Sequence, residues 1–271
     1  MFDVPAYAKI NWSLRITGRR PDGFHDIETL FQTISLHDTL TFAESNHVSL
    51  TCDDPAIPVD DSNLVLRAAR ALGAPPVAIE LRKAIPVGGG LGGGSSDAAA
   101  TLVVLSKQFG IDAPLDDLAL SLGSDVPFFL VGGTAYATGR GEELTPMPPV
   151  AGVPLLLLIP EERVSTASAF AALQSFSPPI GIARYRSMID EGLMSHASEL
   201  INELINDFEE PIFALLPRLR TLKMRLFEMG AAWAGMSGSG STIVGAFRTA
   251  GERDAARGCF TDVHVVAAET T

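Results

Sequence analysis

The sequence predicts an α+β fold with two lobes of similar size, and three observations lead to this prediction. The first half opens with short β-compatible stretches that are followed by helical patterns. The second half is mostly helical, with a few short strands. Between them, the prolines of Pro146–Pro149 separate two patterned regions. We therefore expect an N-terminal lobe over residues 1–150 and a C-terminal lobe over residues 151–271.

The elements of the first lobe follow from turn signals and periodicity. Four β-compatible stretches are separated by turn-rich pieces, namely Val4–Ile16, Asp26–Ser35, Leu40–Ala43 and Val48–Cys52. A helix is predicted over Asn63–Leu72, with Asn63 as its N-cap, and a strand over Val77–Leu81. A second helix is predicted from about Ser96, because four residues form one apolar stripe: Ala98, Leu102, Leu105 and Phe109.

The second lobe begins with the apolar run Leu155–Ile159. Helical patterns follow at Ser165–Leu173, Ala197–Asn206 and Pro217–Met229. Two short strands, Ala232–Met236 and Thr242–Phe247, then flank a glycine-serine run, and a last helix leads to the strand Val263–Ala267.

The composition is that of a folded protein that does not bind nucleic acid through charge. The chain has 20 Lys and Arg and 32 Asp and Glu, which gives a net charge of −12. Association with a polyanion needs a basic surface instead. The two cysteines have no metal-type spacing, and the longest apolar runs fall short of the roughly 20 residues that span a bilayer. The first residues lack a signal-peptide pattern. We expect a cytoplasmic monomer or homodimer with no membrane or nucleic-acid partner.

The strongest functional signal is the run Gly88–Gly94, which has six glycines in seven residues and leads into the helix expected near Ser96. So many glycines are useful chiefly where the backbone approaches another group with its N–H groups exposed. At a helix N-terminus these N–H groups and the helix dipole attract an anion. The run predicts a phosphate-binding loop before a Ser-capped helix, and a flexible linker is the alternative.

Two known glycine motifs do not fit this run. A P-loop requires Lys after the last glycine, where Ser95 stands. Gly88, Gly90 and Gly93 have the spacing of a dinucleotide-binding turn, but Pro86 interrupts the strand that should lead into it. The match to that spacing is therefore accidental.

Asp125 and Lys9 are the candidates for handling a proton or a phosphoryl group. Asp125 lies between a helix stop and an apolar stretch, where an N-cap role is an equally good interpretation. Lys9 lies in a strand-like segment, where lysines are usually exposed. Residues 1–20 hold four basic residues against one acidic residue, a local charge of +3 that suits a phosphate ligand but also a solvated turn.

Three motifs resemble those of the GHMP kinases, the superfamily of galactokinase, homoserine kinase and mevalonate kinase. Pro86–Ala100 resembles their ATP-binding glycine motif, Ala6–Asn11 their first motif and Gly235–Ser241 their third, in the same order. The resemblance covers nearly the whole chain. It implies an ATP-dependent small-molecule kinase with an ATP-binding, catalytic N-terminal lobe built on a mixed sheet and a ferredoxin-like C-terminal lobe.

Two further segments, Thr17–Gln32 and Gly123–Phe129, are similar to members of the superfamily whose alcohol substrate carries a cytidine diphosphate group. The resemblance implies that Asp125 accepts or orients the proton of the substrate hydroxyl and that Lys9 neighbours both Asp125 and the γ-phosphate. It implies ATP contacts from Asn63, Lys83, Pro86, Gly88, Gly89, Gly90, Leu91, Gly92, Gly93, Gly94, Ser95 and Ser96. Ser95 or Ser96 would also stand near Mg²⁺, while helix capping is the alternative role for Asn63.

The resemblance also implies a substrate-binding set. Phe24, His25 and Phe170 would hold the cytidine, and the substrate would be lined by Asn11, Phe31 and Thr166. Stacking on aromatic rings is a favourable way to hold a pyrimidine. Phe24 stands where the family commonly has Tyr, and Arg140 stands where a smaller apolar residue is expected, so that its role is open. Core packing is the alternative for Phe170.

Two rival functions remain open at this point. One is a different GHMP kinase, acting on homoserine or a sugar, against which the segment Gly18–Gln32 argues. The other is an inactive nucleotide-binding sensor, which could keep the glycine run without a catalytic pair. The presence of both Lys9 and Asp125 argues against the sensor.

Overall fold

The computed structural model describes residues 3–193 and 199–271, and two compact units alternate along the chain. Unit 1 comprises Met1–Ala8, Leu36–Val87 and Gly92–Gly132, and unit 2 comprises Lys9–Ser35, Gly88–Leu91 and Gly133–Thr271. The first two strands and the glycine run therefore contribute to both units. A boundary between two consecutive lobes at residue 150 stays a prediction.

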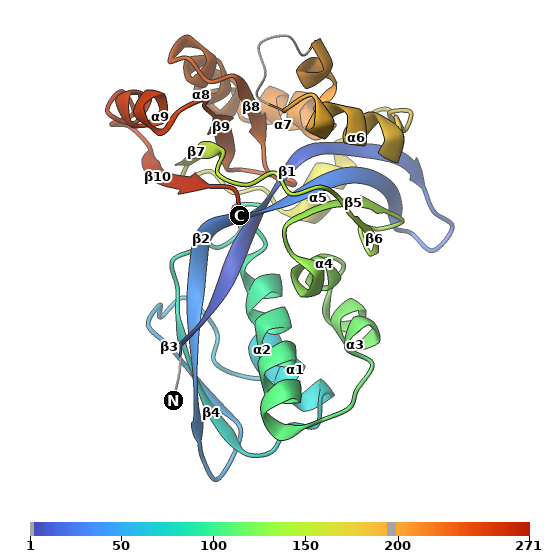
Figure 1. The fold of residues 1–271 in the computed structure, drawn as a ribbon, viewed down its shortest axis with the longest axis vertical. Helices are drawn as coiled ribbons and strands as arrows, with labels where there is room; N and C mark the ends of the chain where they lie inside the picture. The colour runs from blue at the N-terminus through green and yellow to red at the C-terminus, as the bar shows by residue number, and fades with distance from the viewer. Residues whose placement is uncertain (1–2, 194–198) are drawn as a thin grey trace. The chain divides into compact units, whose positions relative to one another are not determined.

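Unit 1 is a mixed sheet whose apolar side is covered by helices (Figure 1). The long strands β1 (Asp3–Arg19) and β2 (His25–Glu44) pair with each other. Within unit 1, β2 pairs antiparallel with β4 (Val77–Arg82), which pairs in parallel with β3 (Ser49–Cys52). The helices of this unit are α1 (Leu64–Ala71), α2 (Gly93–Phe109), α3 (Leu115–Leu122) and α4 (Val126–Val131).

The predicted apolar stripe of α2 is confirmed for three of its four residues. Ala98, Leu102 and Leu105 are fully buried in the core of unit 1, together with Leu40 and Phe42 of β2, among others. Phe109, at the end of the helix, is 36% exposed and lies outside this core. The residue follows the helical period, but α2 ends there, at the left-handed Gly110.

The predicted break between strands Asp26–Ser35 and Leu40–Ala43 is wrong, because β2 is continuous. Asp38, in the middle of the predicted break, is fully buried. One of its carboxylate oxygens accepts hydrogen bonds from the backbone N–H groups of Ala84 (2.6 Å) and Ile85 (2.8 Å), and the other accepts from Lys83. Partners more than 40 residues away satisfy this carboxylate, so a polar stretch that looks like a turn can remain a strand.

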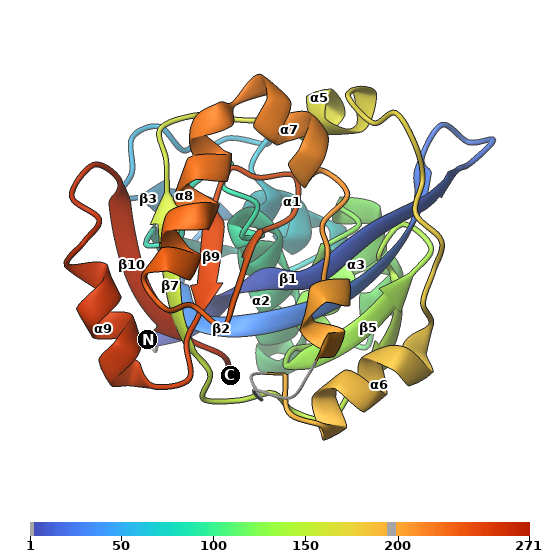
Figure 2. The same cartoon turned by 90° about the horizontal axis from the view of Figure 1, so that it is seen from above.

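Unit 2 contains two sets of paired strands. The first residues of β2 pair antiparallel with β5 (Thr134–Thr138), which pairs with β6 (Glu143–Pro146). A separate antiparallel sheet has the order β10-β7-β9-β8 and consists of β10 (His264–Glu269), β7 (Pro154–Ile159), β9 (Ile243–Ala246) and β8 (Trp233–Met236). Helix α8 (Pro217–Glu228) packs on β8 and β9, and α9 (Ala250–Arg257) packs on β7 and β10 (Figure 2). This antiparallel sheet with helices packed on it agrees with the α/β C-terminal lobe that the resemblance implied.

The remaining helices of unit 2 are α5 (Thr166–Ala171), α6 (Ile182–Asp190), the 3₁₀ helix Glu199–Glu203 and α7 (Glu209–Leu215). The helix predicted over Ala197–Asn206 begins outside the described residues, and its described part contains the 3₁₀ helix. No helix in residues 3–193 and 199–271 is both long and apolar enough to cross a bilayer.

Candidate active site

The glycine run forms a loop that ends in the first turn of α2. Gly88, Gly90 and Gly92 all have positive φ values, between 70° and 78°, which residues with a side chain rarely adopt. The prediction of a Ser-capped helix from Ser96 is wrong, because α2 begins at Gly93 and its N-cap is Gly92. The last glycines are therefore helical, and the N–H groups at this helix start are not capped by a side chain.

The start of the run lies against the third motif within unit 2. The hydroxyl of Ser237 donates to the carbonyl of Gly90 (2.9 Å), and the backbone N–H of Thr242 donates to the carbonyl of Gly89 (3.3 Å). The backbone N–H of Lys9, in the first motif, donates to the carbonyl of Leu91 (2.9 Å). Three segments that are far apart in the sequence thus meet through hydrogen bonds to the carbonyl groups of the glycine run.

The side chain of Lys9 belongs to a polar group that links the first and third motifs. Its Nζ donates to Oδ1 of Asn11 (2.8 Å), and the same oxygen accepts from the backbone N–H of Gly238 (3.0 Å). Nδ2 of Asn11 donates to Thr29 (2.7 Å), so the amide is held at both ends. The ammonium of Lys9 also lies 5.3 Å from the ring centroid of Phe31. Lys9 is buried, contrary to the usual exposed lysine of a strand.

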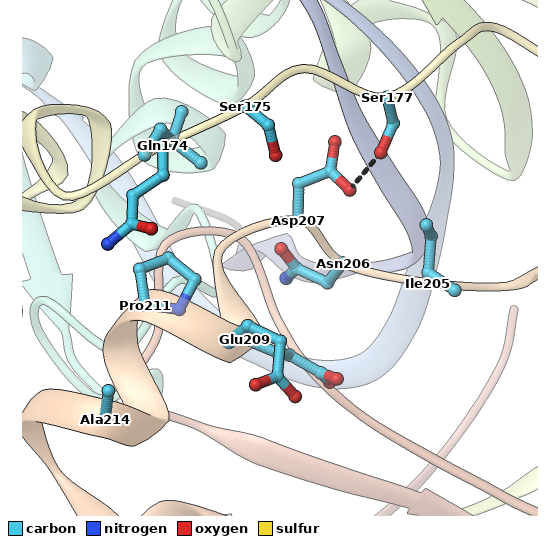
Figure 3. Close-up of a pocket in the computed structure, with 11 residues that line it drawn as sticks. Gln174, Ser175, Ser177, Ile205, Asn206, Asp207, Glu209, Pro211 and Ala214 are labelled. Atoms are coloured by element: carbon cyan, nitrogen blue, oxygen red, sulfur yellow. Dashed lines mark hydrogen bonds between the residues drawn. The ribbon is translucent and has the colours of Figure 1, made fainter.

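Two residues that the sequence did not single out hold the third motif in place. The amide of Asn206 donates to the carbonyls of Met236 (2.7 Å) and Gly238 (2.8 Å). Oε1 of Glu209 accepts from the backbone N–H of Met236 (2.8 Å). Both residues also line a cavity of about 540 Å³, where Ser177 donates to Asp207 (Figure 3). Only tertiary structure reveals these supports, because no local pattern marks them.

In unit 1, Lys83 lies in a buried ion triad. Its Nζ donates to Asp97 on α2 (2.9 Å) and to Asp38 on β2. Burial is the main cause that raises the pKa of Asp97 to about 7. The nearby charge of Lys83 lowers this pKa, and the neighbouring carboxylate of Asp38 raises it further. Burial opposes the charged form of Lys83 as well, but the two carboxylates raise its pKa above the ordinary value. Oδ1 of Asp97 is buried and has no hydrogen-bond partner among residues 3–193 and 199–271. A nucleotide contact of Lys83 stays a prediction.

Of four other predicted residues in unit 1, two have local hydrogen-bonding roles. Asn63 caps α1 by accepting from the backbone N–H of Val65 (2.9 Å), which confirms its capping role, while its contact with ATP stays a prediction. Ser96 is buried and donates to the carbonyl of Tyr7 (2.7 Å), whereas Ser95 is only partly buried. Asp125 stands at the N-cap of α4, yet its side chain makes no capping hydrogen bond. Lys9 and Asp125 lie in different units, and their pairing stays a prediction.

The residues predicted to hold the cytidine lie in unit 2. His25 stacks on Phe170, with ring centroids 4.5 Å apart and an interplanar angle of 15°. Burial, together with the charge of Arg19, lowers the pKa of His25 below its ordinary value. Phe24 is 50% exposed. The hydroxyl of Thr166 lies 3.2 Å from that of Ser239 in the third motif. Phe170 also packs on Phe208, which agrees with the alternative prediction that Phe170 contributes to core packing.

The chain matches family models in both of its halves. The model of the GHMP kinases N terminal domain matches residues 63–133, and that of the GHMP kinases C terminal domain matches residues 189–264. With the glycine loop and the third motif in contact, the fold and the motifs define a kinase of the GHMP superfamily. The two-lobed GHMP fold predicted from the sequence is confirmed.

More detailed similarity narrows the family. The chain is 42% identical over 260 residues to a 4-diphosphocytidyl-2-C-methyl-D-erythritol kinase of Chlorobium luteolum, with 91% of this chain and 89% of the relative covered. It is 41% identical to one of Prosthecochloris aestuarii, with 90% and 88% covered. A crystal structure of a 4-(cytidine 5'-diphospho)-2C-methyl-D-erythritol kinase matches with a TM-score of 0.85 at 34% identity, over 99% of each chain. The chain belongs to the 4-diphosphocytidyl-2-C-methyl-D-erythritol kinase family.

Proposed function

We propose that this protein transfers the γ-phosphoryl group of ATP to the 2-hydroxyl of 4-diphosphocytidyl-2-C-methyl-D-erythritol, a step of the non-mevalonate (MEP) route to isoprenoid precursors. The observation that supports this most is the meeting, within unit 2, of Lys9, the start of the glycine run and the third motif. Family membership supports the choice of substrate.

The glycine run is suited to hold the phosphates of ATP. Its glycines have no side chains that would block a phosphate from the backbone N–H groups, and the start of α2, which no side chain caps, adds the positive end of a helix dipole. We infer that Ser95, not Ser96, offers its hydroxyl to Mg²⁺, because Ser96 is buried and bonded to Tyr7. Hydroxyl and phosphate oxygens are ligands that Mg²⁺ accepts, and the bound ion would offset phosphate charge.

Two side chains are assigned to the transfer itself. Asp125 would accept or orient the proton of the 2-hydroxyl, and Lys9 would offset charge on the phosphoryl group. Because a loose transition state for phosphoryl transfer needs little deprotonation, positioning by Asp125 is expected to matter at least as much as proton removal. The fixed amide of Asn11 keeps the ammonium of Lys9 in one place.

The cytidine end would be held by Phe24, His25 and Phe170, beside Thr166. The lowered pKa of His25 keeps its imidazole neutral at pH 7, so one ring nitrogen can donate to the base and the other can accept. Since His25 and Phe170 stack directly on each other, a base that enters between them must separate the two rings.

The proposal is tested by measuring ADP release with ATP and Mg²⁺, with and without 4-diphosphocytidyl-2-C-methyl-D-erythritol, and with homoserine as a second acceptor. We expect turnover of the cytidylylated substrate only. Asp125→Asn should lower kcat by about 10² to 10⁴-fold. Asp116→Asn, which changes an exposed carboxylate in the first turn of α3, is the matched control and should be unchanged.

Turnover of homoserine without competition by cytidine nucleotides would reassign the substrate. Release of ADP with none of the acceptors, in a protein that still binds ATP, would favour the nucleotide-binding sensor. An Asp125→Asn variant as active as the Asp116→Asn control would remove Asp125 from the reaction while leaving the substrate assignment intact.

A further inference from the structure

Arg140 lies in the turn between β5 and β6, a turn built to hold its central residue still. Gly139 and Gly141, on either side, have φ values of 67° and 108°. The carbonyl of Gly139 accepts from the backbone N–H of Ile27 on β2 (2.8 Å), and the N–H of Gly141 donates to Thr138 (3.0 Å). The turn is thereby fixed to the first residues of β2, directly after Phe24 and His25.

The side chain of Arg140 is fixed on two sides. One oxygen of Glu142 accepts from the backbone N–H of Arg140, and the other accepts from its Nε (3.3 Å). The guanidinium lies over the ring of Phe24, with Cζ 4.7 Å from the ring centroid. Phe24 therefore covers one face of the guanidinium and Glu142 binds its Nε, and together these contacts fix the orientation of the guanidinium plane.

The remaining edge of this guanidinium is available to a ligand, although its charge also helps to lower the pKa of the nearby carboxylate of Asp22. Among the residues that the structure describes, Nη1 and Nη2 of Arg140 donate to none, and the side chain is 25% exposed. Its neighbour Arg20 differs, because its guanidinium bridges Asp22 (3.1 Å) and Asp26 (2.9 Å). Of Arg20 and Arg140, only Arg140 therefore has both Nη1 and Nη2 without a hydrogen bond to the described residues.

We propose that Arg140 binds the diphosphate of the substrate's cytidine diphosphate group through Nη1 and Nη2, while Phe24 holds the guanidinium in the plane that this contact needs. This inference rests on the proposed function, and it assigns to the open residue Arg140 a part in recognising the substrate. Glu142 is a positioning residue, which acts through Arg140.

The chemistry of the open edge favours the diphosphate over the base. Nη1 and Nη2 present only donors, in a fork that matches two oxyanion oxygens. The edge of cytosine mixes acceptors with the donor N4–H₂, so it matches this fork less well. In a chain with a net charge of −12, a fixed cation is also needed to bring two negative phosphates close to the surface.

The test compares CDP with cytidine, two probes that share the base and differ in the phosphates. Calorimetric titration measures the affinity of each for the intact protein and for Arg140→Met, Arg140→Lys and Glu142→Gln. We expect Arg140→Met to weaken CDP about 10- to 100-fold and to change cytidine by less than about 2-fold. Arg140→Lys should recover part of the CDP affinity, because it keeps the charge but not the fork. Glu142→Gln should weaken CDP less than Arg140→Met does.

Arg70→Met is the matched control, because Arg70 lies on α1 in an exposed ion pair with Asp61 and should leave both affinities unchanged. Equal losses for CDP and cytidine in Arg140→Met would overturn the inference, since they would mean that Arg140 serves only the base or the ring of Phe24. Unchanged CDP affinity would overturn it as well. Turnover assays distinguish the failure of this inference from the failure of the proposed function. If the wild-type enzyme is active and Arg140→Met leaves its KM for the cytidylylated substrate unchanged, this inference alone is refuted. If the wild-type enzyme is inactive, the proposed function is refuted.

Discussion

The two halves of the glycine run are held by different physical means. The first half, Gly88–Leu91, is fixed in unit 2 by hydrogen bonds from the backbone of Lys9 in the first motif, from the hydroxyl of Ser237 in the third motif and from the backbone of Thr242 next to it. Gly90 packs so tightly that a Cβ there would lie 2.1 Å from the carbonyl oxygen of Ser237. The second half, Gly92–Gly94, provides the N-cap and the first two residues of α2 in unit 1. Asp97, three residues further along α2, accepts a hydrogen bond from the buried ammonium of Lys83.

This difference teaches why glycine recurs in the run. In the first half glycine is required by backbone conformation and by close contact with another backbone, both of which forbid a side chain. In the second half only Gly92, the N-cap of α2, has a positive φ, whereas Gly93 and Gly94 are helical and Gly94 has only ordinary contacts around it. The conformation of the second half depends on the buried ion pairs of Lys83 with Asp38 and Asp97. Different substitutions should therefore disrupt the two halves.

The largest loss of stability is expected from Lys83→Met, which removes the ion pairs that support the second half of the run. Removing the ammonium leaves Asp38 and Asp97 as buried carboxylates without their cation, which should lower the free energy of unfolding by about 3–5 kcal/mol. Urea denaturation measures this loss. The control is Arg82→Met, one residue away, whose ion pair with Asp3 is exposed and should contribute at most about 1 kcal/mol. A Lys83→Met variant as stable as the control, with a raised KM for ATP, would show that Lys83 serves the nucleotide instead.

Gly90→Ala attacks the first half and should cost about 3 kcal/mol. The added methyl group meets a backbone oxygen, which cannot swing away as a side chain can, and the φ of 78° adds strain of about 1–2 kcal/mol. The same variant should lose ATP turnover more strongly than its stability alone explains, since the loop must shift. Thermal unfolding and the kinase assay measure the two effects. Stability within about 0.5 kcal/mol of wild type would mean that the first half is not rigidly docked.

The sequence predicted the glycine loop, most of the strands and helices around it, and the three motifs that meet within unit 2. It failed on the start of α2, because a glycine N-cap carries no side-chain signal and Ser96 looked like one. It failed on the continuity of β2, because the partners of Asp38 lie at residues 83–85. The second error arises because local patterns do not record long-range hydrogen bonds.

The supports of the site were also beyond reach of the sequence. Asn206 and Glu209 sit in a segment without a motif, and only their hydrogen bonds to Met236 and Gly238 reveal what they do. The sequence did not single out Asp97 either, although it is buried against Lys83 in the first turns of α2. A buried charge is visible only when the fold that buries it is known.

A smaller effect, of about 2 kcal/mol, is expected in the pH dependence of the second half. Because the pKa of Asp97 is raised to about 7, its stabilising contribution is fully present below pH 4 and is lost as the pH rises through 7. Wild type should therefore lose stability relative to Asp97→Asn between pH 5 and pH 8. Urea denaturation of both proteins at four pH values measures the difference. A difference that is flat with pH would mean that Asp97 stays ionised throughout.

The smallest effect is expected from Gly94→Ala, which sharpens the comparison within the second half. Gly94 is helical and exposed, and a Cβ there would meet only Leu64 at 3.8 Å, so alanine should stabilise the protein by up to about 1 kcal/mol. The backbone N–H is retained, so the KM for ATP should stay within about 2-fold. Gly93→Ala is the contrasting variant, because its Cβ would meet Ile85 at 3.0 Å and should destabilise. If both variants are equally destabilising, the first turn of α2 tolerates no side chain, and the two halves of the run are constrained alike.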